Sequence, residues 1–213
     1  MTEQRTPLTV TNLLVFVNVV VFLCWIGLPT PFMAEHFLVS WDHVVGGRPW
    51  VLLSSVFSHT MIFHLLINMI VLMSFGPPLE QMLGWRRFLT FYLLAGLVGS
   101  VAHATTSRFL MESGDMPALG ASGAIAGLLL VFSLAFPKAR VLLFFIIPIP
   151  AIVAALAFIG IDIWGLIAQM DDGGLPIGHG AHLGGAFTGI FYYLFRREAF
   201  RGPDATPWAR DAS

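Results

Sequence analysis

The sequence predicts an all-α membrane protein, folded as a bundle of six transmembrane helices. Of the 213 residues, 57% are hydrophobic and only 11% are charged. A soluble domain has about 25% charged residues, so this chain lacks the polar surface that water requires. The apolar residues also lie in long runs, which are typical of helices in a bilayer, and not in alternating or amphipathic patterns. We therefore expect the lipid bilayer to surround most of the chain.

Six runs are long enough for a spanning helix, which needs about 20 apolar residues. They cover approximately residues 9–29, 60–78, 88–106, 120–136, 146–169 and 179–195. The first run lacks the small-residue cleavage site of a signal peptide, so we interpret it as a retained helix. Residues 1–213 are expected to form a single membrane domain, with a polar cytoplasmic tail at 198–213.

The basic residues are unequally divided between the two sides of these spans. If the span ends alternate between sides, one side carries Arg5, Arg86, Arg87, Lys138, Arg140, Arg196, Arg197, Arg201 and Arg210. The other side carries only Arg48 and Arg108. By the positive-inside rule, both termini are expected in the cytoplasm. The expected location is a cell (inner) membrane.

Charge and cysteine content exclude other classes of protein. The formal net charge is −1, so no basic excess suggests a nucleic acid partner. The single cysteine, Cys24, rules out a disulfide framework and a cysteine-based zinc site.

Polar side chains from three predicted spans gather in the outer half of the membrane. They are His59, His64, Asn68, Ser122, His179 and His182. Polar groups at that depth are costly, face the bundle interior and indicate a functional site. The span at 120–136 is only about 17 residues, or roughly 26 Å, long, whereas the hydrocarbon core is about 30 Å thick. We therefore expect Ser122 to lie below the outer surface, beside a loop that admits water.

Small residues indicate which spans touch. Gly120, Gly123, Ala124 and Gly127 give one span a smooth face, and Ala181, Gly185 and Gly189 do the same for another. Such faces let helix backbones approach closely. If these two faces dock, Ser122 Oγ and His182 come within hydrogen-bond reach.

These residue types supply most of an acyl-transfer site. The Ser122 hydroxyl needs a neighbouring base to attack a carbonyl, and His182 can serve. A developing oxyanion needs donors, which the Ser122 backbone N–H, His64 and Asn68 can provide. The missing part is a carboxylate to orient His182. Asp162 is the only acid within the spans that is available, and we interpret it as a structural or interfacial residue.

Three motifs resemble those of the rhomboid intramembrane serine proteases, and the resemblance covers nearly the whole chain. Residues 120–123 (GASG) resemble the GxSG motif of that family, and residues 181–185 (AHLGG) resemble its AHxxG block. Residues 64–68 (HLLIN) resemble its HxxxN motif. The segment from Gly76 to Phe88 resembles the turn between its second and third helices.

The resemblance implies an intramembrane serine endopeptidase with a Ser–His dyad. Ser122 would be the nucleophile and His182 the general base and acid. His64, Asn68 and the Ser122 amide would stabilise the oxyanion. No metal or organic cofactor would be required. Substrates would be single-span membrane proteins that enter sideways past the fifth helix, and the site would open to the non-cytoplasmic side.

Two positions depart from the family pattern. The first outer loop often carries a Trp-Arg pair in that family, whereas here Val51 follows Trp50 and Arg48 precedes it. Some members have an aromatic residue four positions after the nucleophile, where Ala126 stands here. The packing that orients His182 is therefore not explained by the sequence.

Three other classes of function compete with this interpretation. A catalytically inactive relative would bind client proteins without cutting them. A metalloenzyme could use His59, His64, His179 and His182 as ligands. A transporter would place its polar residues at the membrane midplane between inverted repeats, which are not visible here. We interpret His59, His103 and His179 as hydrogen-bonding or interfacial residues outside the catalytic set.

Overall fold

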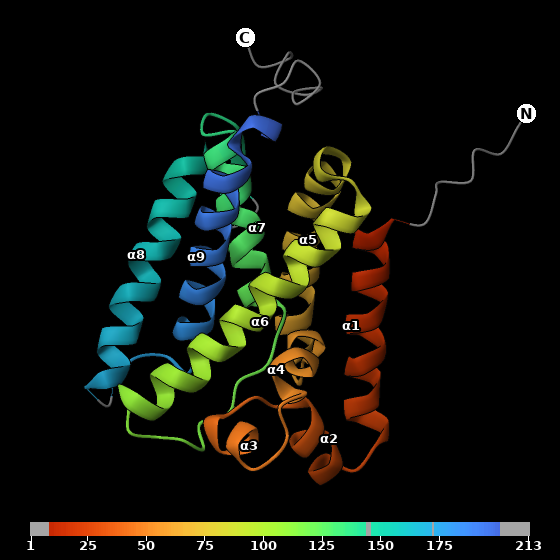
Figure 1. Cartoon of the computed structure of the whole chain (residues 1–213), viewed down its shortest axis with the longest axis vertical. Coiled ribbons are helices and arrows are strands. Elements are labelled where there is room, and N and C mark those ends of the chain that lie inside the picture. Colours follow the sequence, from red (N-terminus) through yellow and green to blue (C-terminus); the bar gives the residue numbers. More distant parts are fainter. Residues whose placement is uncertain (1–8, 144–145, 172, 201–213) are drawn as a thin grey trace, which may run out of the picture.

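A computed structural model describes residues 9–143, 146–171 and 173–200, which are mainly helical (Figure 1). The long helices are α1 (Val10–Gly27), α5 (Ile62–Leu83), α6 (Trp85–Phe109), α7 (Ser122–Ala135), α8 (Ala151–Met170) and α9 (His179–Arg196). Short helices in the first loop are α2 (Thr30–Phe37), α3 (Trp41–Val45), α4 (Val51–Ser54) and the 3-10 turn η1 (Ser55–Phe57). The remaining elements are β1 (Arg140–Leu143), β2 (Ile147–Pro150) and the 3-10 turn η2 (Arg197–Phe200).

The long helices form two groups joined by α6. Helices α7, α8 and α9 lie side by side in one group, and α1 packs along α5 in the other (Figure 1). Helix α6 crosses obliquely between the groups and contacts both α7 and α9. The short helices α2, α3 and α4 lie together at one end of the bundle (Figure 1).

The apolar core lies where α5, α6 and α7 meet. Its fully buried side chains include Leu72 and Leu79 of α5, Phe88 and Tyr92 of α6, and Leu128 of α7. Large apolar side chains also cover the outside of the bundle, as a bilayer requires.

Four of the described helices are long and apolar enough to cross a membrane: α1, α5, α6 and α8. Helix α7 has only 14 residues, and α9, with 18 residues, carries two histidines and several glycines. The predicted segments at 120–136 and 179–195 are helical, but α7 and α9 are not among the four helices that are long and apolar enough to cross a membrane. Helix α7 is mostly buried inside the bundle, whereas α9 also has large apolar side chains on the outside, including Phe187, Phe191 and Phe195.

The structure is mainly helical, as expected, and contains one small hairpin. Strands β1 and β2 pair antiparallel, with Arg140 opposite Pro150. The predicted span at 146–169 therefore begins as a helix only at Ala151. Pro148 and Pro150 explain the difference, because proline favours an extended conformation in the residue before it and lacks an N–H for helical hydrogen bonds.

The 3-10 turn η2 overlaps the first residues of the predicted tail at 198–213. Phe200, at the end of η2, is buried and its ring centroid lies 5.6 Å from that of Tyr193. Residues 201–213 of that predicted tail lie outside the described residues.

Helices α7 and α9 are in backbone contact. A Cβ added at Gly185 would overlap the carbonyl oxygen of Gly123, and one added at Gly123 would lie 3.1 Å from the carbonyl oxygen of Ala181. Helix α6 joins at the same place, because a Cβ at Gly99 would lie 2.8 Å from the same Ala181 oxygen. Small residues thus let three helices meet where the first turns of α7 and α9 lie.

This contact predicts opposite effects for two glycine-to-alanine substitutions. Gly185→Ala must push α7 and α9 apart, and we expect it to lower the unfolding free energy by about 1–3 kcal/mol, the usual cost of overpacking. Gly160→Ala, in α8, is the matched control because a Cβ there meets nothing within 4 Å. It should leave stability unchanged or raise it by up to about 1 kcal/mol. Thermal unfolding in detergent measures both variants, and equal stability would contradict the backbone contact.

Candidate active site

A tight turn places Ser122 at the beginning of α7. Gly120 has a φ of +124°, which favours glycine, and its N–H donates to the carbonyl oxygen of Ser55 at 2.9 Å. A Cβ at Gly120 would lie only 2.7 Å from Cε1 of His64. Glycine is therefore needed both for the turn and for the approach of the His64 ring. Ser122 follows as the first residue of α7, where backbone N–H groups lack helical partners.

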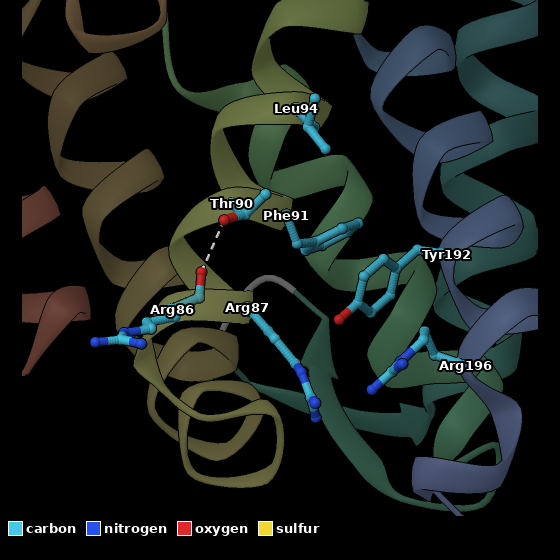
Figure 2. Close-up of a pocket in the computed structure, with 7 residues that line it drawn as sticks. All are labelled: Arg86, Arg87, Thr90, Phe91, Leu94, Tyr192 and Arg196. Carbon is cyan, nitrogen blue, oxygen red and sulfur yellow. Dashed lines mark hydrogen bonds between the residues drawn. The ribbon is translucent and has the colours of Figure 1, made fainter.

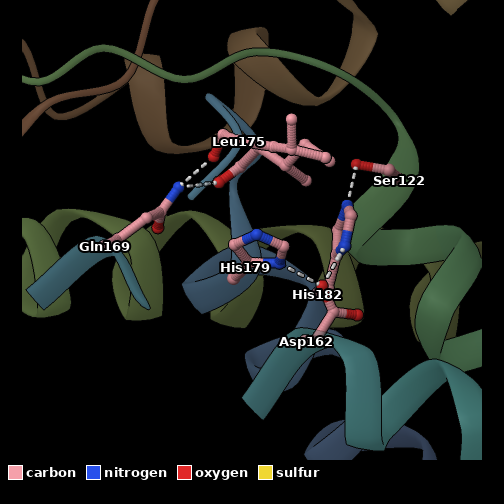
Figure 3. Close-up of polar contacts among 7 residues, drawn as sticks. Ser122, Asp162, Gln169, Leu175, His179 and His182 are labelled. Atoms are coloured by element: carbon pink, nitrogen blue, oxygen red, sulfur yellow. Dashed lines mark hydrogen bonds and ion pairs between the residues drawn. The ribbon is translucent and has the colours of Figure 1, made fainter. Parts of the chain in front are cut away.

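The first turn of α9 places His182 opposite Ser122. Nε2 of His182 lies 2.8 Å from Oγ of Ser122 (Figure 3). Both side chains are partly buried, and the exposed fraction of the His182 side chain is 13%. The backbone contact of Gly185 with Gly123 sets this spacing, since each glycine lies within three residues of one of the two reacting groups.

A buried carboxylate lies on the other side of the His182 ring. Oδ1 of Asp162, in α8, is 2.9 Å from Nδ1 of His182 and 2.6 Å from Nδ1 of His179 (Figure 3). An ionised carboxylate only accepts hydrogen bonds, so both Nδ1 atoms donate to it. A neutral His182 then carries its proton on Nδ1. Its Nε2 is left as an acceptor that faces the Ser122 hydroxyl.

Asp162, which the sequence indicated as a structural or interfacial residue, lies inside the bundle. The residue is 3% exposed and contacts His182 directly. His179 was correctly expected to be a hydrogen-bonding residue, but it is also part of this cluster. The sequence could have placed His179 beside His182, because the two histidines are three residues apart and therefore share a helix face.

Helix α8 also supplies the aromatic packing that the sequence did not explain. The ring centroid of Phe158 lies 5.4 Å from that of His182, with an angle of 30° between the planes. Phe158 and Asp162 are four residues apart, so they share one face of α8. Phe158 thus provides the aromatic packing that some other members of the family obtain from the position of Ala126.

The expected oxyanion donors His64 and Asn68 both lie on α5. The His64 ring lies against Gly120. Asn68 is buried, and its Nδ2 donates to the carbonyl oxygen of His64 at 2.8 Å. Among the described residues, neither side chain hydrogen-bonds to Ser122 or His182. One amide proton of Asn68 remains available for another acceptor.

Two further histidines lie outside the Ser122–His182–Asp162 cluster. Nε2 of His103 lies 3.2 Å from the carbonyl oxygen of Met116. His59 is fully buried, and its ring centroid is 4.8 Å from that of His64.

The residues that could hold a metal differ from the expected four histidines. Within the described part of the chain, Asp162, His179 and His182 have ligand atoms within 4.8 Å of one another. His59 and His64 form a separate pair. Carboxylate and imidazole ligands suit zinc, but in this arrangement both Nδ1 atoms already donate to Asp162.

Comparison with known proteins gives a consistent result. The chain matches the family model described as Rhomboid domain over residues 46–199. It is 35% identical over 201 residues to RHOMBOID-like protein 12, mitochondrial, from Arabidopsis thaliana, which covers 88% of this chain and 59% of that protein. It is 34% identical over 190 residues to Rhomboid protein 1, mitochondrial, from Saccharomyces cerevisiae. This match covers 87% of this chain and 53% of that protein.

A human protein is similar to the same extent. Presenilin-associated rhomboid-like protein, mitochondrial, from Homo sapiens is 34% identical over 201 residues, covering 89% of this chain and 48% of that protein. The chain thus spans about half the length of the curated relatives it matches.

These relatives correct the expected location. All three are named as mitochondrial proteins, so the expectation of a cell membrane, with a site opening to its non-cytoplasmic side, is wrong. The charge count could not reveal this, because it compares the two sides of a bilayer and does not identify the bilayer.

The family itself follows from the extent of these matches. The family model covers more than half of the chain, and the relatives align with most of it. This helical membrane protein therefore belongs to the rhomboid family.

Proposed function

We propose that the protein is an intramembrane serine endopeptidase, which hydrolyses peptide bonds in or near the transmembrane segment of single-span membrane proteins. The observation that carries this proposal is the 2.8 Å contact between Ser122 Oγ and His182 Nε2, in a partly buried position. A hydroxyl and a base in hydrogen-bond contact are the minimal requirement for nucleophilic catalysis.

Ser122 is the nucleophile of this mechanism. As its Oγ attacks the scissile carbonyl carbon, its proton passes to His182 Nε2, and a tetrahedral oxyanion forms. His182 then returns the proton to the leaving nitrogen as the C–N bond breaks, which leaves an acyl group on Ser122. Water then loses a proton to His182 as it attacks the acyl carbon. When the ester C–O bond breaks, His182 returns that proton to Ser122 Oγ, and the second product leaves as a carboxylic acid.

The oxyanion requires donors that already point to its position. The backbone N–H of Ser122 is suitable because it begins α7, where the helix dipole also favours negative charge. We assign His64 and Asn68 as further donors, since both lie on α5 and His64 reaches Gly120, two residues before the nucleophile. Gly120, Gly123, Ala181 and Gly185 support the site by allowing close backbone packing.

Asp162 is a positioning residue in this proposal. It fixes the tautomer that leaves Nε2 of His182 free to accept the Ser122 proton, and it stabilises the imidazolium that then forms. His179 holds the same carboxylate oxygen at 2.6 Å and thereby keeps Asp162 in place. The catalytic pair is thus extended to a Ser–His–Asp arrangement.

The surrounding membrane is proposed to be mitochondrial, after the names of the relatives. We propose that α7 and α9 cross it together with α1, α5, α6 and α8, which makes six spans within one membrane domain at 1–213. The two ends of the chain then lie on the same side, the side with most of the Lys and Arg residues. Substrates are proposed to enter past α8, which forms the outer wall of the site.

Replacing the nucleophile tests the proposal. We expect Ser122→Ala to lower cleavage of a model single-span substrate by at least about a thousandfold, because no other group replaces the attacking oxygen. Ser133→Ala is the matched control: Ser133 is also buried in α7, and its hydroxyl has no partner within the described residues. Gel-based cleavage in detergent measures both.

Two outcomes would contradict the assignment of Ser122. One is unchanged cleavage by Ser122→Ala with the thermal stability of the wild type. The other is activity that a chelator removes and zinc restores, which would favour a metal held by Asp162, His179 and His182.

Replacing the positioning carboxylate should affect turnover more than substrate binding. We expect Asp162→Asn to reduce kcat by about 10²–10⁴-fold with little change in KM, because the amide can stabilise the wrong His182 tautomer. Asp162→Glu should restore part of kcat. Asp171→Asn, at the exposed end of α8, controls for the charge change. A change in KM alone, or the same loss in the control, would contradict the role of Asp162.

A further inference from the structure

A basic pocket lies far from Ser122, between the beginning of α6 and the end of α9. Its lining residues are shown in Figure 2, and its volume is about 290 Å³. The polar part of its lining comes from Arg86, Arg87, Thr90, Tyr192 and Arg196. No step of the proposed proteolysis uses this pocket.

Two of the arginines converge in the pocket. The side chains of Arg87 and Arg196 extend from different helices toward a common space, and the Tyr192 hydroxyl is directed toward it as well (Figure 2). Arg86 points away, and its guanidinium group lies 5.0 Å from the centroid of the Trp85 ring. The pocket therefore presents two guanidinium groups and one hydroxyl donor to a single ligand.

Within the described residues, no acid neutralises these guanidinium groups. The one arginine in an ion pair there is Arg48, which pairs with Glu35. Glu80, near the pocket in sequence, instead accepts hydrogen bonds from the N–H groups of Val10 and Thr11 at 2.7 and 2.8 Å. Two unpaired cations that face the same space favour a ligand with at least one negative charge.

The apolar part of the lining continues from the arginines along α6. Phe91 forms the buried floor, and Leu94, one turn further, is 48% exposed on the outer surface of the helix. A ligand held by Arg87 and Arg196 would thus have an apolar surface beside it. A headgroup next to acyl chains has this distribution of charge and apolar surface.

We propose that this pocket binds the phosphate group of an anionic phospholipid. Guanidinium groups match the oxygens of phosphate in geometry and charge, and the Tyr192 hydroxyl can donate to a third oxygen. The acyl chains lie along Phe91 and Leu94. Basic pockets between membrane helices bind anionic headgroups by this combination of contacts. Free phosphate can make the same contacts with the guanidinium groups, but it has no apolar part to contact Phe91 and Leu94.

The test compares lipid retention by three forms of the purified protein. They are the wild type, Arg87→Gln/Arg196→Gln, and the control Lys138→Gln/Arg140→Gln, which removes two positive charges from the same predicted side but outside the pocket. Each is incubated in detergent with phosphatidylglycerol, with phosphatidylcholine or with inorganic phosphate. Native mass spectrometry measures bound ligand, and thermal unfolding checks that each variant is folded.

We expect the wild type and the control to retain phosphatidylglycerol in preference to phosphatidylcholine. The pocket variant should lose about fivefold in affinity per arginine, hence about 25-fold in total. Equal retention of both lipids by the wild type, or equal loss in the control variant, would overturn the proposal. If the wild type bound inorganic phosphate but did not retain phosphatidylglycerol, the ligand could not be a phospholipid. These readouts do not depend on proteolysis, so they stand apart from the proposed function.

Discussion

The backbones of α7 and α9 meet where Gly185 faces the carbonyl oxygen of Gly123. Any side chain at Gly185 would hold the two helices apart. Ser122 begins one helix and His182 lies in the first turn of the other, so the spacing of the helices becomes the spacing of the hydroxyl and the imidazole. Because interiors are close-packed, a small increase in that spacing cannot be absorbed elsewhere. The Oγ–Nε2 contact of 2.8 Å thus depends on two residues without side chains.

Helix α8 completes the site from the opposite side. Phe158 packs against the His182 ring, and Asp162 accepts from its Nδ1, so one face of α8 restrains both the plane and the tautomer of the imidazole. A carboxylate buried in a bundle is costly unless it is hydrogen-bonded. The N–H groups of His179 and His182 both donate to Oδ1 of Asp162, whereas Oδ2 is buried without a hydrogen-bond partner among the described residues. The same bonds tie α8 to α9.

The closeness of Ser122 and His182 could be expected from the sequence because it follows from local features. Small residues at fixed intervals mark helix faces that touch, and each reacting residue lies next to such a face. The partners from α8 could not be derived in this way. Asp162 and Phe158 lie in a uniformly apolar run, where no amphipathic pattern shows which face points inward. The orientation of α8 about its own axis, which the structure gives, is needed to see that this face meets His182.

Other differences have equally specific causes. Residues 140–143 and 147–150 pair as two strands because the prolines of the second strand disfavour a helix, although the composition of both is as apolar as that of a span. Helix α7 has 14 residues and is mostly buried by the bundle, and α9 is less apolar because its buried face carries His179 and several glycines. The location of the protein is not encoded in charge asymmetry, and it was the mitochondrial relatives that corrected it.

Labelling with a fluorophosphonate tests the central claim most directly, because this reagent reports an activated hydroxyl without any substrate. Mass spectrometry of the labelled wild type should identify Ser122 as the modified residue. His182→Ala, folded to the same thermal stability, should remain unlabelled because the hydroxyl has lost its base. Modification of a different serine, or equal labelling of Ser122 in the absence of the imidazole, would contradict the account.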